Sequence, residues 1–85
     1  MPTCRGADLR GANLQDAILT GAQLQNANLE EADLMMTNFK GAQLKGTRLG
    51  GAYLHGADLS QAVDLTAEQL KETYSDENTQ LPPGL

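Results

Sequence analysis

The chain has 85 residues, a formal net charge of −5, no tryptophan, one phenylalanine and two tyrosines. A chain this short is expected to form one domain, and it cannot easily bury enough apolar surface for an irregular globular core. The acidic balance argues against direct binding of nucleic acid, which needs clustered lysine and arginine. Because there is one cysteine, Cys4, an intrachain disulfide is excluded.

No segment resembles a targeting or membrane-spanning sequence. No apolar run approaches the roughly 18 residues of a membrane span, and the N-terminus lacks the apolar region of a signal peptide. We therefore expect no membrane association and a cytoplasmic protein. The thylakoid lumen or the periplasm is the alternative if the chain is a processed fragment.

A large apolar residue recurs at every fifth position, and a small residue stands two positions before each one. Neither the helical period of about 3.6 nor the strand period of 2 collects residues at this spacing on one face. A chain that turns a corner after every fifth residue does collect them, because the small and large residues then point to the same side of a short extended segment. The predicted inward column is Leu9, Leu14, Leu19, Leu24, Leu29, Leu34, Phe39, Leu44, Leu49, Leu54 and Leu59.

The remaining positions of each quintet fit this interpretation. The residue between the small and the large one points outward and is mostly polar. The last position is usually glycine, and it is Asp16 or Asn26 in two quintets. These residue types tolerate the dihedral angles of tight turns, so the corner is predicted to follow each leucine.

The quintets ADLRG, ANLQD, AQLQN, ANLEE, ADLMM and ADLSQ resemble the A(D/N)LXX repeats of the pentapeptide-repeat proteins. The resemblance covers roughly residues 5–62. It implies an all-β fold, a right-handed quadrilateral β-helix (β-solenoid) with about three coils of twenty residues each. We expect residues 1–64 to form this β-helix, with Leu9, Leu29 and Leu49 in one stack, and Arg10 to lie over Glu30 on its surface.

The repeat breaks after Ala62, and the following residues have the pattern of a helix start. Thr66 and Gln69 have the spacing of a capping box, and Leu65 and Leu70 that of a hydrophobic staple. The sequence predicts a short α-helix over residues 67–74 that caps the last coil, so that residues 65–85 form a capping helix and tail of the same domain. This segment also resembles the C-terminal extension of many pentapeptide-repeat proteins of photosynthetic bacteria.

The N-terminal end has no comparable cover in the sequence. Cys4 falls in the leucine register, so the first coil is expected to begin almost at once. Three interpretations stay open: Pro2 blunts this edge, a second subunit covers it by self-association through the N-terminal coil, or upstream sequence is missing. Cys4 itself is expected to fill a small core site, with a redox role as the alternative.

The sequence contains no metal-ligand spacing, phosphate loop or nucleophile motif, so we expect no enzyme activity, metal or cofactor. The single histidine, His55, is expected at a solvated corner. The most unusual surface patch combines acidic residues with a methionine pair, which is typical of an adaptable binding site. This candidate interaction surface is Glu30, Glu31, Asp33, Met35 and Met36.

Two functions follow. The first is a non-enzymatic, rigid protein-interaction module whose protein partner is not specified by the sequence. The second is implied by the resemblance, because some pentapeptide-repeat proteins mimic duplex DNA and modulate DNA gyrase. Two features weigh against mimicry here: three coils span only about 14 Å, and one expected stack mixes Asp16 with Met36 and Gly56.

Overall fold

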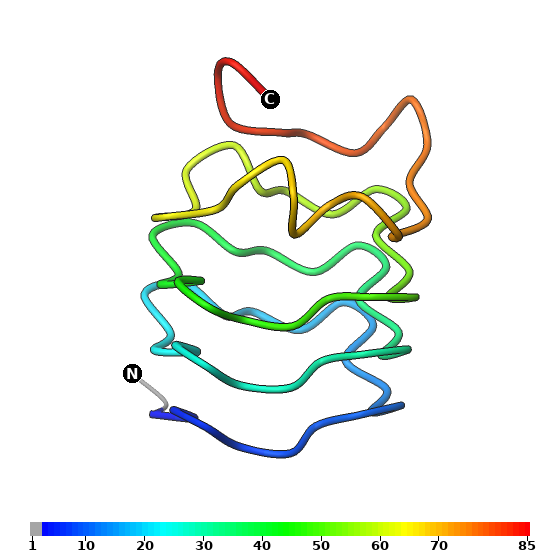
Figure 1. Cartoon of the computed structure of the whole chain (residues 1–85). Helices are drawn as coiled ribbons and strands as arrows, with labels where there is room; N and C mark the ends of the chain where they lie inside the picture. Colours follow the sequence, from blue (N-terminus) through cyan, green and yellow to red (C-terminus); the bar gives the residue numbers. More distant parts are fainter. Residues whose placement is uncertain (1–2) are drawn as a thin grey trace.

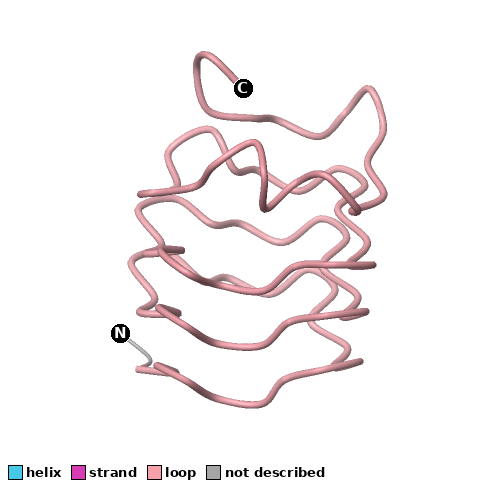
Figure 2. Cartoon of the chain, in the orientation of Figure 1, coloured by secondary structure: helices cyan, strands magenta, loops and turns pink. Residues whose placement is uncertain are grey.

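The computed structural model describes residues 3–85 as a stack of coils with the C-terminal segment lying over the last one (Figure 1). Residues 1 and 2 lie outside this range. Residues 3–85 contain no helix and no continuous strand, and isolated parallel β-bridges join each coil to the next (Figure 2). From residue 3 to residue 63 every bridge joins residues that are twenty apart, which agrees with the predicted coil length.

Four columns of outward-facing residues define the four sides of the coil. Each bridge uses both backbone groups of the outward residue: the N–H of Asn28 donates to Ala7 O at 2.8 Å, and its carbonyl accepts from Leu9 N at 2.8 Å. The columns are Asp8, Asn28 and Arg48 on side I; Asn13, Asp33, Tyr53 and Tyr74 on side II; Ile18, Asn38, Asp58 and Gln80 on side III; and Thr3, Gln23, Gln43 and Val63 on side IV.

The core consists of the leucine columns and the small residues beside them. Phe39 is fully buried in the middle of the stack, whereas Cys4 and the leucines of the first coil are partly buried. Two threonines replace alanine in the core, and each hydroxyl has a partner: Thr37 Oγ1 donates to Leu14 O at 2.8 Å and Thr47 Oγ1 to Leu24 O at 2.7 Å. The fully buried large residues are Leu24, Leu29, Leu34, Phe39, Leu44, Leu49, Leu54 and Leu59.

Each corner is a hydrogen-bonded β-turn that starts at the leucine. At the corner that follows Leu9 the N–H of Ala12 donates to Leu9 O at 3.1 Å. The residue before the closing N–H is left-handed at every corner from residue 6 to residue 56, with φ between +61° and +75°. Glycine adopts this conformation freely, whereas other residues lose about 1–2 kcal/mol there. Four corners nevertheless carry another residue: Asp16, Asn26, Glu31 and Met36.

The aspartates and asparagines at outward positions stabilise these corners, a role that the sequence pattern did not reveal. A side-chain oxygen accepts the backbone N–H two residues further on: Asn28 from Glu30 at 3.0 Å, and Asn38 from Lys40 at 3.0 Å. The same contact occurs at Asp8, Asn13, Asp33 and Asp58. A short acid or amide at this position therefore links the side to the corner that follows it.

The predicted capping helix over residues 67–74 is wrong. The Thr66–Gln69 box does form, with Thr66 N donating to Gln69 Oε1 at 2.8 Å and Gln69 N donating to Thr66 Oγ1 at 3.3 Å. However, the next N–H groups bond three residues back, as in turns: Leu70 N donates to Ala67 O at 3.1 Å. The Gln69 amide also donates to the carbonyls of Leu44 and Thr47 in the coil below, which fixes this end of the segment to that coil.

The chain instead returns to the coil path. Tyr74 bridges to Tyr53 and Gln80 to Asp58, so the spacing rises from twenty to twenty-one and then twenty-two residues. Tyr74 N donates to Ala52 O at 2.9 Å, and this bond uses the N–H that a helix over residues 67–74 would direct at Leu70 O. Leu65 and Leu70 pack against the core from this segment. The C-terminal segment thus covers the core as a partial further coil.

Candidate functional site

The five residues of the candidate interaction surface lie on one stretch of the second coil. Glu30 and Glu31 form the corner before side II, Asp33 is its outward residue, and Met35 and Met36 form the corner after it. The coils above and below contribute the equivalent residues. We call this surface the acidic side and define it as residues 10–16, 30–36, 50–56 and 71–77.

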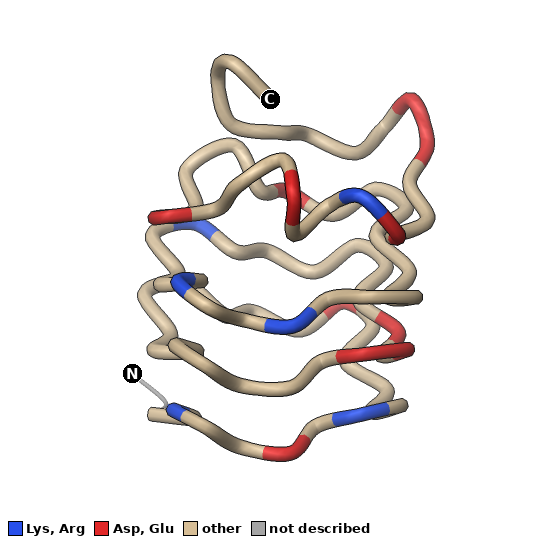
Figure 3. Tube along the Cα trace, in the orientation of Figure 1, with Lys and Arg blue, Asp and Glu red and all other residues tan. Residues whose placement is uncertain are grey.

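The acidic side carries the whole net charge of the chain. It contains seven carboxylates and two cations, a formal charge of −5, which equals the net charge of all 85 residues. The rest of the chain holds four acidic and four basic residues and is therefore neutral. Figure 3 shows many of the acidic segments gathered toward the right of the view. The carboxylates are Asp16, Glu30, Glu31, Asp33, Glu72, Asp76 and Glu77.

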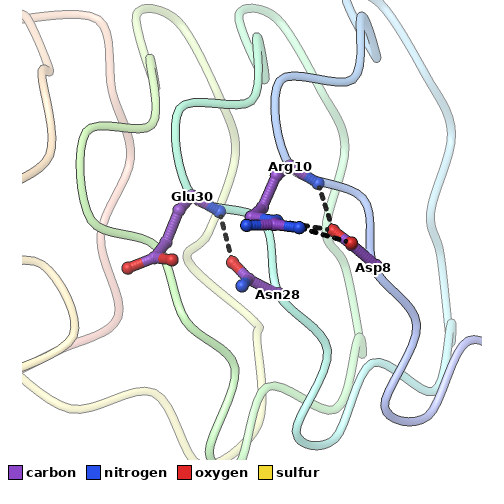
Figure 4. A network of polar contacts seen from close by, with 4 residues as sticks. All are labelled: Asp8, Arg10, Asn28 and Glu30. Carbon is purple, nitrogen blue, oxygen red and sulfur yellow. Dashed lines mark hydrogen bonds and ion pairs between the residues drawn. The ribbon is translucent and has the colours of Figure 1, made fainter.

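Both cations of the acidic side pair with carboxylates outside it. The Arg10 guanidinium donates to both carboxylate oxygens of Asp8, at 2.9 and 2.8 Å (Figure 4). Lys71 lies 3.7 Å from Glu68. Arg10 therefore pairs with Asp8, two residues away on the same coil, and not with Glu30 as expected. Glu30 instead pairs with Arg48 at 3.7 Å.

Hydrogen bonding lowers the pKa of two carboxylates on or next to the acidic side. The hydrogen bonds from the Arg10 side chain and backbone lower the pKa of Asp8 to about 2. At Asp76, desolvation favours the neutral acid, but hydrogen bonds from Gly56 N, Asn78 N and the Thr79 hydroxyl outweigh it and lower the pKa. Both groups are therefore anionic at neutral pH, Asp76 on the acidic side and Asp8 beside it.

Two tyrosines from different coils stack on the acidic side. The ring centroids of Tyr53 and Tyr74 are 5.0 Å apart with an interplanar angle of 17°. Their side chains stay 42% and 54% exposed, so a large part of the paired aromatic surface faces solvent. The pairing depends on the continued coil, since Tyr74 reaches Tyr53 through the bridge between them. The sequence pattern did not find this pair because Tyr74 lies outside the repeat.

A groove runs beside the tyrosines at the corner before side II. Gly50 and Gly51 lack side chains there. The groove is also lined by Glu30 and Glu31 of the coil below, by Glu72 and Tyr74 of the C-terminal segment, and by the two cations Arg10 and Lys71. Carboxylates from two coils converge over its floor: a Cβ on Gly50 would lie 3.6 Å from Glu30 Oε2 and 3.9 Å from Glu72 Oε1. The arrangement offers a planar cation both negative oxygens and an aromatic face.

The two methionines of the candidate surface differ in exposure. Met36 is 61% exposed at its corner, whereas Met35 is half-buried rather than outward-facing. Met36 has φ +61°, and Glu31 at the preceding corner has the same value. Neither residue type favours this left-handed conformation, unlike the asparagine and aspartate at the other two substituted corners.

The remaining residues singled out by the sequence lie elsewhere or differ from expectation. Cys4 is partly buried against the core as a free thiol. His55 is half-buried rather than solvated, and its buried Nδ1 has no hydrogen-bond partner among residues 3–85. Within the same range no three His, Cys, Asp or Glu side chains are grouped as a metal site would require. The described residues also include no helix of the length and hydropathy needed to cross a bilayer.

These features define a β-solenoid repeat protein with one charged, aromatic side. The family described as Pentapeptide repeats matches residues 3–34 and 37–66 in eight copies. The chain belongs to the pentapeptide repeat family. No curated protein matches it significantly.

Solved structures of similar proteins come from cyanobacteria and a plant. Rfr23, a pentapeptide repeat protein of the cyanobacterium Cyanothece 51142, is 31% identical over 93% of this chain, with a TM-score of 0.52. A pentapeptide repeat protein of the Arabidopsis thaliana thylakoid lumen is 20% identical over 88% of this chain, with a TM-score of 0.55, and shows the same fold. HetL of Nostoc, described as involved in heterocyst differentiation regulation, is 36% identical over 71% of this chain, with a TM-score of 0.48.

These relatives are longer than the chain described here. The chain spans 33% of HetL, 56% of Rfr23 and 55% of the Arabidopsis protein.

Proposed function

We propose that this chain is a non-enzymatic, rigid protein-interaction module that binds a partner protein through its acidic side. The solenoid backbone supports this function, since a surface held by bridges on every coil loses little conformational freedom on binding. The acidic side also differs from the rest of the surface: it carries a net charge of −5 and exposes Tyr53, Tyr74 and Met36.

The observation that carries the proposal is the conformation of Glu31 and Met36. Both hold φ +61° at corners where glycine, asparagine or aspartate would relieve the strain. Strained residues often persist at functional sites, and the inference runs from the strain to a function. Both residues are also exposed, so the fold does not need their side chains in the core.

A capture experiment with matched variants tests this function. The wild-type chain, Met36→Gln and Ile18→Gln are used as baits in an extract of the source cells. Ile18 is the control because it is 76% exposed but lies on side III. A partner that binds wild type and Ile18→Gln, and is lost from Met36→Gln, supports the proposal. Partners held equally by all three baits would refute binding through the acidic side.

Modulation of DNA gyrase by mimicry of duplex DNA is the alternative that the family resemblance suggests. It requires carboxylates repeated along the stack, as phosphates repeat along DNA. The corner column after side II instead contains Asp16, Met36 and Gly56, and its top is Asp76. A gyrase supercoiling assay separates the two functions: an interaction module of the proposed kind leaves supercoiling unchanged at a large molar excess.

A further inference from the structure

We propose that the acidic side docks an arginine-bearing basic segment of the partner protein, with a guanidinium group in the groove over Gly50 and Gly51. This rests on the proposed function and names the chemistry of its partner. Tyr74 lines the groove, and Glu31 and Glu72 lie on opposite sides of the glycine floor. The groove is about 720 Å³ and open to solvent, so an extended segment can enter it from the side.

Charge complementarity selects a cationic occupant. The acidic side carries −5. Its two cations, Arg10 and Lys71, also line the groove, but each pairs with a carboxylate outside the acidic side, Asp8 and Glu68. Among residues 3–85, Glu31 and Glu72 take part in no ion pair. A basic segment can therefore bind Glu31 and Glu72 without breaking an existing ion pair. The negative electrostatic potential of the acidic side attracts such a segment from a distance.

The aromatic surface selects arginine over lysine. A guanidinium is planar, stacks on aromatic faces and forms two parallel hydrogen bonds with a carboxylate, whereas an ammonium is a compact and more strongly hydrated charge. Tyr74 lines the groove, its ring is stacked on Tyr53, and the residue stays 54% exposed. A ring with carboxylates beside it matches both properties of arginine at once.

The test uses short labelled peptides and fluorescence anisotropy. A glycine–arginine peptide is the probe, and peptides with lysine or citrulline in place of arginine are the controls for charge and shape. We expect the arginine peptide to bind more tightly than the lysine peptide, the citrulline peptide not to bind, and affinity to fall with added salt. Equal affinity for arginine and lysine in wild type would overturn the role of the tyrosine stack.

Two matched double variants locate the site. Glu31→Gln with Glu72→Gln removes two carboxylates from the groove. Asp58→Asn with Asp64→Asn makes the same charge change outside the acidic side, at carboxylates that pair with neither Arg10 nor Lys71. The groove variant is expected to weaken arginine-peptide binding about tenfold, the effect of losing one charge-assisted hydrogen bond. The control variant is expected to weaken it far less. Similar losses in both would show nonspecific attraction and overturn the docking site.

Gly50→Leu gives a second test that leaves every charge in place. Gly50 is not left-handed, and the atoms nearest to a Cβ added there would lie at ordinary contact distance, so a side chain fills the groove without disturbing the coil. Binding should be lost although thermal unfolding is unchanged. Unchanged binding by a folded Gly50→Leu protein would contradict the proposal.

A second copy of this chain is the other occupant that the groove could bind, and light scattering detects it as a dimer. A dimer that dissociates in the Glu31→Gln, Glu72→Gln variant, together with no peptide binding, would assign the groove to self-association and overturn the proposal. If the arginine peptide fails to bind but a captured partner is still lost with Met36→Gln, the proposed function stands and the arginine assignment is wrong.

Discussion

The thioether sulfur of Met36 lies where a side chain on Gly56 would be. A Cβ on Gly56 would collide with Met36 Sδ, and Met36 Cγ and Cε lie 3.6 and 3.7 Å from the same point. The two residues occupy the same corner in successive coils. The same relationship joins Asn26 with Gly46 and Glu31 with Gly51. Each substituted left-handed corner of the second coil therefore lies beneath a glycine of the third coil, which leaves room for its side chain.

Gly56→Ala is expected to destabilise the protein by more than Gly11→Ala. Both residues are left-handed, at φ +70° and +67°, but a Cβ on Gly11 has nothing within 4 Å. Gly11→Ala should lose about 1–2 kcal/mol from backbone strain alone, and Gly56→Ala about 0.5–1.5 kcal/mol more, because the exposed Met36 side chain must leave its rotamer to make room. Urea unfolding measures both. In a Met36→Ala background the extra loss at Gly56 should vanish, and its persistence would contradict the contact.

Met36→Asn is expected to raise stability while it weakens partner binding. Asparagine adopts left-handed φ more readily than methionine, so the substitution should add up to about 1 kcal/mol. Met36 is 61% exposed, and little core packing is lost with its side chain. Met35→Asn is the control, since residue 35 is not left-handed and should gain nothing. A less stable Met36→Asn protein in chemical denaturation would argue against strain at this corner.

Asn38→Ala is expected to lose about 0.5–1.5 kcal/mol of stability, the net value of one hydrogen bond. The lost contact is that between Asn38 Oδ1 and the N–H of Lys40 at 3.0 Å. Gln43→Ala is matched to it, because Gln43 also bridges two coils but makes no such corner contact within the described residues. Equal unfolding midpoints for Asn38→Ala and wild type would show that the outward asparagine only provides a polar exterior.

The Asp8 carboxyl is expected to titrate at pH about 2. Its folded pKa lies below the ordinary value of 3.8, so its contribution to stability is complete above that value and is lost as the pH falls toward 2. NMR titration of the carboxyl carbon measures the midpoint. Arg10→Gln removes the largest cause of the shift and should return the midpoint toward 3.8. A wild-type midpoint already near 3.8 would show that the Asp8–Arg10 pair does not persist in solution.

The repeat predicted the coil because each quintet carries its own signal. Leucine, small residue and corner recur independently of what lies above or below, so each corner can be worked out locally, whereas the twenty-residue coil was implied by the family resemblance. Contacts between coils were harder to predict. Arg10 was expected to contact Glu30 in the next coil, but Asp8 is closer along the chain and presents both carboxylate oxygens. The hydrogen bonds from corner N–H groups to the outward aspartates and asparagines could be recognised only from the atomic positions.

The C-terminal segment could not be predicted for a different reason. Thr66 and Gln69 form the local contacts of a helix start, but the Gln69 amide also donates to the carbonyls of Leu44 and Thr47, a contact between coils that the local pattern does not contain. Two added residues shift the register to twenty-one and twenty-two, so no repeat indicates that Tyr74 lies on Tyr53. The charge of residues 10–16 and 30–36 was readable from the sequence once residues twenty apart were aligned, whereas the position of Glu72, Asp76 and Glu77 and the aromatic pair were not.

The stacking of Tyr53 on Tyr74 is the most direct test, because the complete acidic side exists only if the coil continues through the C-terminal segment. The chain has two tyrosines and one phenylalanine, so their ring signals can be assigned with little overlap. NMR should show nuclear Overhauser contacts between the two tyrosine rings, whose centroids are 5.0 Å apart, and no helical chemical shifts over residues 67–74. Helical shifts there, with Tyr74 remote from Tyr53, would contradict the continued coil and the binding surface built on it.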